Sequence, residues 1–121
     1  MSKLRILLII LTVWSFSSCN RLSEAERQEW SRGKEVYLAH CVSCHGADGK
    51  GLGGAYPSLT RTVITSDFSQ RAKYLINNGS PGMGGMLAIP ISTKETMEVI
   101  NYIQNAWGNE AEFETLGSNN L

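Results

Sequence analysis

The chain has 121 residues, of which 42% are hydrophobic and 18% are charged, and its 11 Lys and Arg residues balance 11 Asp and Glu residues. This length suits one domain, and the composition is that of a globular protein rather than a disordered chain. A net charge of zero argues against the basic stripe with which nucleic-acid-binding proteins meet phosphates, so we expect no nucleic-acid partner.

The first 18 residues have the pattern of a secretory signal. Lys3 and Arg5 give a short positive start, an apolar run covers residues 6–16, and two serines follow. The run is shorter than the about 20 apolar residues that a membrane-spanning helix needs. We therefore expect residues 1–18 to be removed and the protein to be exported to the periplasmic side.

Cys19 follows this run in an arrangement that resembles the cleavage site of bacterial lipoproteins, where the cysteine becomes the lipidated first residue. Phe16 stands where that site usually has an aliphatic residue, and ordinary cleavage nearby is the alternative. The chain has three cysteines, an odd number for an exported protein. A lipid on Cys19 accounts for the third, so we expect a membrane anchor there, with residues 19–27 as a membrane-proximal segment.

The first predicted helix begins at Ser23, because Ser23 and Glu26 have the spacing of a capping box, and it ends just before Cys41. Gly33 lies inside this helix, where glycine costs about 1 kcal/mol relative to alanine. A glycine in this position suggests close packing against another element.

Residues 41–45 read Cys-Val-Ser-Cys-His, the pattern of covalent haem attachment. Two thiols at this spacing can each add to a vinyl group on one porphyrin edge, and the next histidine can then reach the iron. A thioredoxin-like dithiol expects a preceding strand. A zinc site needs two ligands beyond the cysteines, and only His40 remains as a donor besides His45. A disulfide leaves the following loop unexplained. We interpret Cys41 and Cys44 as the attachment sites of one haem c and His45 as an iron ligand.

Residues 46–66 contain five glycines and no clear periodicity. Such a long loop is unusual inside a compact domain, and three modest helices alone give a thin core. A large apolar cofactor would supply that core and order the loop. The glycines of residues 49–54 also match a dinucleotide-binding pattern, which we reject because no strand and helix flank it.

Two further helices are predicted. One covers residues 67–77, with Gly79 as its stop. The other begins at Ser92, with Glu95 in capping-box register, and ends at Gly108. Its apolar stripe comprises Val99, Ile100, Ile103, Ala106 and Trp107. Residues 110–121 form a polar C-terminal tail that we expect to be loose.

From residue 28 to residue 109 the chain resembles class I cytochromes c. The matching segments are the glycine-rich run after the haem motif, the next landmark Tyr-Pro-Ser-Leu and the end of the last helix, at residues 44–51, 56–59 and 102–109. The resemblance implies an all-α cytochrome c domain over residues 28–109, with about three main helices and irregular loops around one covalently bound haem.

Individual roles follow from the same resemblance. The Pro57 carbonyl is expected to accept the spare N–H of His45, which fixes the histidine tautomer. Leu59 is expected to pack on the haem ring. Gly33 is expected to lie where the first and last helices cross.

The sixth iron ligand departs from the family pattern, in which a methionine followed by proline precedes the last helix. Met83 and Met86 both lie in this loop, and neither precedes a proline. We favour Met86 because Glu95 follows it by nine residues, against twelve for Met83, and because residues 86–90 lead directly into the helix cap at Ser92. The other methionine would then fill apolar space beside the haem.

Histidine and methionine ligation fills both axial positions of the iron, so we expect outer-sphere electron transfer between redox proteins rather than enzymatic catalysis. The alternative is a five-coordinate haem protein that binds small gases or reduces peroxide, if neither methionine reaches the iron. A general shuttle and a dedicated partner of one oxidase, reductase or dehydrogenase are both compatible with the sequence.

Overall fold

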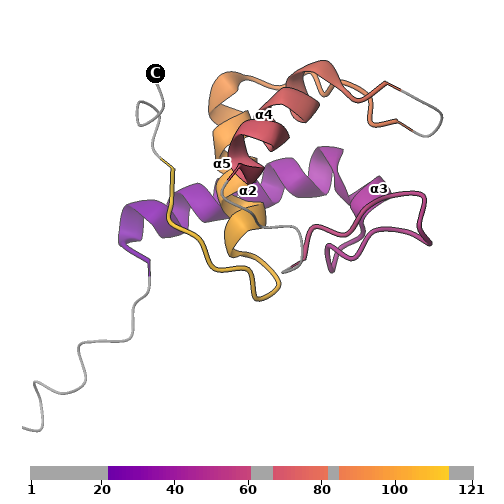
Figure 1. The fold of residues 1–121 in the computed structure, drawn as a ribbon. Helices are drawn as coiled ribbons and strands as arrows, with labels where there is room; N and C mark the ends of the chain where they lie inside the picture. Colours follow the sequence, from indigo (N-terminus) through magenta and orange to yellow (C-terminus); the bar gives the residue numbers. More distant parts are fainter. Residues whose placement is uncertain (1–21, 61–66, 82–84, 115–121) are drawn as a thin grey trace, which may run out of the picture.

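The computed structural model describes residues 22–60, 67–81 and 85–114 (Figure 1). Over these ranges the chain contains four helices and no strand: α2 (Glu24–His40), α3 (Val42–His45), α4 (Phe68–Asn78) and α5 (Thr93–Asn105). The predicted all-α fold is confirmed, and α3 is an additional short helix. None of the helices in the described part has both the length and the apolar character needed to cross a membrane.

Both long helices begin at a capping box, as predicted. The Ser23 hydroxyl accepts from the Glu26 N–H at 3.3 Å, and the Glu26 carboxylate accepts from the Ser23 N–H at 2.6 Å. Ser92 and Glu95 repeat this exchange at the start of α5, at 3.2 and 2.8 Å. These hydrogen bonds satisfy amide donors that the first helical turn leaves without partners. They also lower the pKa of both glutamate carboxyls, chiefly through the serine side chains.

The helices α2 and α5 cross at Gly33. A Cβ atom at this position would lie 2.6 Å from the Glu98 carbonyl carbon and 2.9 Å from the Tyr102 Cβ. Only glycine lets the two backbones approach so closely. The close packing predicted for Gly33 is therefore confirmed, and α5 packs mainly on α2 and over a smaller area on α4.

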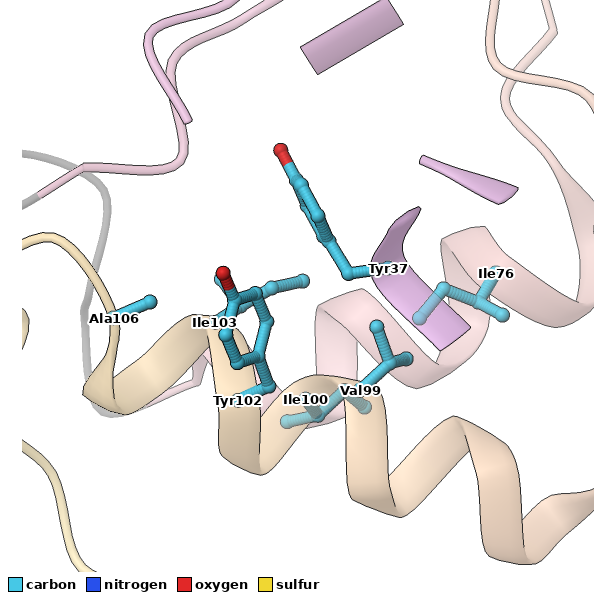
Figure 2. Packing of buried hydrophobic residues seen from close by; sticks show 7 residues of the cluster. All are labelled: Tyr37, Ile76, Val99, Ile100, Tyr102, Ile103 and Ala106. Carbon is cyan, nitrogen blue, oxygen red and sulfur yellow. The ribbon is translucent and has the colours of Figure 1, made fainter. Parts of the chain in front are cut away.

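The hydrophobic core lies at this crossing and combines side chains of α2, α4 and α5 (Figure 2). The buried members are Tyr37, Ile76, Val99, Ile100, Tyr102, Ile103 and Ala106. The ring of Tyr102 has its centroid 5.0 Å from Trp30 and 5.3 Å from Tyr37. Trp107 joins these rings, 5.1 Å from Tyr37 and 5.5 Å from Tyr102. Tilted and edge-on ring pairs stabilise a core beyond their buried area, so this cluster fixes α2 against the last turns of α5.

A charged pair also lies at the crossing. The Glu98 side chain is only 6% exposed, and the Arg32 guanidinium contacts its carboxylate at 2.5 Å. Lys94 lies farther away, at 3.9 Å. The hydrogen bond with Glu98 raises the pKa of Arg32. A carboxylate this buried needs such a partner, because leaving it unpaired would cost its desolvation energy.

The segment after α5 is held against the helices as far as Glu114, in contrast to the loose tail expected from its polar composition. The fully buried Asn101 side chain accepts from the Glu114 N–H at 2.9 Å and donates to the Glu114 carbonyl at 2.9 Å. The same amide donates to Glu29 of α2 at 2.6 Å. Lys73 of α4 binds the Glu114 carboxylate at 3.0 Å. Figure 1 shows this yellow segment turning back from the end of α5.

The helix α5 ends at Asn105, three residues before the predicted stop at Gly108. Ala106 has ψ 161°, which is extended, and Trp107 has φ 51°, which is left-handed. The apolar stripe continues through Ala106 and Trp107 in sequence, but the backbone has already left the helix there. The hydrophobic periodicity alone therefore predicted a helix α5 that extends too far toward the C-terminus.

Candidate functional site

The proposed haem motif lies at the joint between α2 and α3. Cys41 is both the last cap of α2 and the first cap of α3, and its own N–H donates to the Tyr37 carbonyl at 2.8 Å. The N–H groups of Cys44 and His45 donate to the Cys41 carbonyl at 3.2 and 2.9 Å. These hydrogen bonds place both cysteines and the histidine on one short helical turn, which ends at Gly46.

Cys41 and Cys44 are free thiols and partly buried, so the structural disulfide is not formed between them. Cys41 packs against the edge of the core. Burial, with a smaller contribution from the neighbouring Cys44, raises the pKa of the Cys41 thiol to about 11. Cys41 therefore keeps its proton at neutral pH, and neither sulfur is engaged in a disulfide.

His45 meets the carbonyl oxygen of Pro57, with its Nδ1 atom 3.0 Å away. A carbonyl oxygen can only accept a hydrogen bond, so Nδ1 carries the ring proton. The other ring nitrogen, Nε2, then keeps the lone pair that a metal ligand needs. The contact that the resemblance implied between Pro57 and His45 is thus present, and it gives the ring the tautomer and the basicity of an iron ligand.

Backbone hydrogen bonds hold the loop that brings Pro57 to His45. The Gly51 N–H donates to the His45 carbonyl at 2.9 Å, and the Leu59 N–H donates to the Gly49 carbonyl at 2.7 Å. The Tyr37 hydroxyl, from the core, donates to the Gly46 carbonyl at 2.7 Å. Tyr37 thus belongs both to the helix crossing and to the support of this loop, and nothing in the sequence indicated the second role. The glycine-rich segment is therefore folded back on the motif through residue 59.

Met86 lies between α4 and α5, partly buried and in contact with the core. Its carbonyl accepts from the Ser80 N–H at 2.8 Å, and its own N–H donates to the Ser80 hydroxyl at 3.1 Å. Figure 1 shows the described part of the α4–α5 connection and the loop after α3 on the same side of the crossing of α2 and α5. A sulfur donor and the His45 ring thus belong to two segments on this side. Met83, the alternative donor, and Cys19 both lie outside the described residues.

Large apolar side chains of these two segments are exposed. Leu52 is 50% exposed and Tyr56 is 37% exposed in the loop after α3, and Leu87, next to Met86, is 81% exposed. Leu59 is partly buried against the core. A porphyrin is a large apolar ring that side chains of this kind can cover. The paired thiols, the free Nε2 of His45 and this apolar surface fit a covalently bound haem.

A bare metal ion fits the described residues less well. Among them, no three His, Cys, Asp or Glu side chains gather closely enough to hold an ion. The extra ligands that a zinc site would need are therefore not gathered in that part of the chain. Iron in a porphyrin asks only for axial ligands from the protein.

The segment that carries this site is shared with known cytochromes. Residues 28–103, more than half of the chain, match the family described as "Cytochrome C oxidase, cbb3-type, subunit III". The chain is 32% identical over 90 residues to the "Alcohol dehydrogenase (quinone), cytochrome c subunit" of Gluconobacter oxydans (strain 621H). It is 27% identical over 90 residues to the subunits of the same name from Gluconacetobacter polyoxogenes and Komagataeibacter europaeus. These matches cover 65% of this chain but only 19% of each relative, so the chain spans about a fifth of their length.

Proposed function

This chain belongs to the c-type cytochrome family described as cytochrome c oxidase, cbb3-type, subunit III, and on that premise we propose that it carries electrons through one haem c. Cys41 and Cys44 would bind the haem through thioether bonds, and His45 and Met86 would ligate its iron. A haem bound here supplies one-electron chemistry between the ferrous and ferric states.

The hydrogen bond between His45 and Pro57 carries the proposal. It leaves Nε2 of His45 with a free lone pair, one helical turn from Cys41 and directly beside Cys44. An imidazole in this tautomer next to two free thiols is the donor set that a covalently attached haem requires. A buried structural histidine would have no need for the paired thiols.

Met86 supports a carrier rather than a catalyst. With both His45 and Met86 as ligands, a bound haem iron would have no open position for a substrate, and the thioether would favour the ferrous state and so raise the potential. The core contact of Met86 and its two hydrogen bonds with Ser80 hold its backbone in place. In this function the protein orients the ring and excludes water, and substrate chemistry takes place on other proteins.

Leucine substitutions test the ligand assignment, with Met83→Leu as the matched control for Met86→Leu. Leucine keeps the apolar volume and removes the sulfur. Met86→Leu should abolish the sulfur-to-iron charge-transfer band of the ferric protein and lower its potential, whereas Met83→Leu should leave both unchanged. The reverse pattern would assign the ligand to Met83. An unchanged spectrum in both variants, with carbon monoxide binding in the parent, would favour the five-coordinate alternative.

The redox partner is proposed to be a dehydrogenase, an oxidase or a reductase. Three relatives are named as cytochrome c subunits of a quinone alcohol dehydrogenase, and this chain aligns with about a fifth of each. We therefore propose a non-catalytic electron-transfer role beside such an enzyme. Mixing the ferric protein with a substrate-reduced dehydrogenase, or the ferrous protein with an oxidase, in a stopped-flow spectrometer would reveal whether electrons pass between them.

The protein is further proposed to be exported and anchored to a membrane through a lipid on Cys19. The support is the run of residues 6–16, followed by small residues and the cysteine. Mass spectrometry of the native N-terminus decides this point. A mature chain that starts downstream of Cys19 and carries no lipid would contradict the anchor.

A further inference from the structure

The chain leaves α5 through a corner at residues 106–109, where two successive residues are left-handed. Trp107 has φ 51° and Gly108 has φ 83°. This conformation is unfavourable for a residue as large as tryptophan, so it persists only where surrounding contacts hold it. The contacts that hold this corner all involve the core or the loop after the haem motif.

The Trp107 side chain fixes the first part of that loop. Its indole N–H donates to the Ala47 carbonyl at 3.0 Å, two residues after His45. Its ring lies directly on Gly49, where a Cβ atom would come within 2.6 Å of the ring atom Cζ3. Tyr37 supports the ring from the core side, with the centroids 5.1 Å apart. The backbone just after His45 is therefore held against the end of α5.

Asn109 fixes the second part of the loop. Its side chain is buried, with the residue only 4% exposed, and its amide donates to the Leu59 carbonyl at 2.8 Å. A further hydrogen bond from the same amide reaches the Ile103 carbonyl in the last turn of α5, at 2.7 Å. Leu59 lies two residues after Pro57, so Asn109 ties the proline's segment to the same helix end.

Trp107 and Asn109 thus contact the two segments that carry the partners of the His45–Pro57 hydrogen bond. Trp107 holds the segment that begins at His45, and Asn109 holds the segment that contains Pro57. We propose that Trp107 and Asn109 are positioning residues that set the His45–Pro57 hydrogen bond and, through it, the reduction potential of the haem. This inference rests on the proposed function, and it assigns to the corner after α5 a role beyond ending the helix.

The electronic reason lies in the histidine ring. A strong hydrogen bond from Nδ1–H to the Pro57 carbonyl makes Nε2 of His45 a better electron donor, which stabilises ferric iron. If the loop segments move apart, this bond lengthens and Nε2 donates less. The ferric state then loses stability relative to the ferrous state, and the potential rises.

The test uses the haem-loaded protein with two variants and two matched controls. Trp107→Phe keeps a ring in the core and removes the indole N–H, and Trp30→Phe is its control, because Trp30 packs on Tyr102 from α2. Asn109→Ala removes the amide from the loop. Asn105→Ala is its control, because the Asn105 amide donates to the Asn101 carbonyl at 3.1 Å and accepts from the Ala111 N–H at 3.4 Å.

Two measurements distinguish an effect on the His45–Pro57 hydrogen bond from a general loss of stability. The midpoint potential is measured by spectroelectrochemical titration, and exchange of the His45 ring N–H is measured by NMR of the ferrous protein. Trp107→Phe and Asn109→Ala should raise the potential and speed this exchange about fivefold, as expected for weakening one hydrogen bond. The controls should leave both values unchanged even where they lower the unfolding midpoint.

Unchanged values in Trp107→Phe and Asn109→Ala, or equal shifts in the controls, would overturn the proposal. If Asn109→Ala does not retain haem, the result for Trp107→Phe alone decides whether the proposal holds, because this substitution perturbs the structure less. Failure of the proposed function has a different signature. The parent protein itself would then lack covalent haem or a reversible one-electron couple.

Discussion

Replacing Gly33 with alanine would place a methyl group between the backbones of α2 and α5. In an ordinary helix interior this change is favourable by about 1 kcal/mol, because alanine is the better helix former. At Gly33 the new carbon would lie 2.6 Å from the Glu98 carbonyl carbon and 2.9 Å from the Tyr102 Cβ. Unbonded carbon atoms rest at about 3.5–4.0 Å, so the helices would have to separate by roughly 1 Å.

The magnitude follows from these two opposing effects. Overpacking of a core costs about 1–3 kcal/mol, and the upper end applies here because backbone atoms of α5 cannot rotate away as a side chain can. Subtracting the gain in helix propensity leaves a net loss of about 2 kcal/mol for Gly33→Ala. For a domain of this size the melting temperature should fall by roughly 8 °C or more.

The assay is guanidinium unfolding of the haem-loaded protein, followed by far-UV circular dichroism. Ser31→Ala serves as the control, since Ser31 is exposed on the same helix, and it should change the unfolding free energy by less than about 0.5 kcal/mol. If Gly33→Ala proves as stable as the parent or more stable, the helices do not cross as tightly as the structure has them, and the reasoning is wrong.

Three further predictions concern the haem, a buried charge and pH. Replacing Cys41 and Cys44 with alanine should leave a haem-free chain with a weak helical signal and no cooperative transition, and unfolding near the parent's midpoint would contradict this. Arg32→Ala should destabilise the protein, because it leaves the buried Glu98 carboxylate without its guanidinium partner, and a double-mutant cycle with Glu98→Gln measures the coupling. The pKa of Glu95 lies below its ordinary value of 4.5, so its stabilising contribution is present above pH 4.5 and is lost as the pH falls through the lowered pKa. Glu95→Gln should reduce the slope of unfolding free energy against pH in this acidic range, and an unchanged slope would show that other groups govern it.

The sequence alone was sufficient for features that act over a few residues. The capping boxes at Ser23 and Ser92 start α2 and α5 at the predicted residues, because a cap needs only a hydroxyl and a carboxylate three residues apart. The motif of residues 41–45 indicates haem attachment in the same local way, since two thiols and an imidazole within one turn suit one porphyrin edge, and this assignment stays a prediction. The helix α3 was missed because four residues are too few to show a periodicity.

The hydrogen-bond partner of His45 was predicted from the resemblance over residues 28–109, not from the motif itself. Pro57 lies twelve residues after His45, and nothing in the spacing of residues 46–56 shows that the loop returns to the motif. Only the resemblance to class I cytochromes c supplied this pair. In the structure, the close backbone hydrogen bonds among residues 45–59 explain the return.

The tertiary structure alone decided how the corner after α5 supports this loop. The indole of Trp107 and the carbonyl of Ala47 are 60 residues apart in sequence, and Asn109 and Leu59 are 50 apart. The sequence placed Trp107 on the helical stripe of the core, whereas its left-handed backbone takes it off the helix and onto the loop. Local preference disfavours that conformation in tryptophan, and the contacts that stabilise it form only when α2, α5 and the loop have packed together. Interactions of this kind depend on the whole fold, and therefore no window of the sequence predicts them.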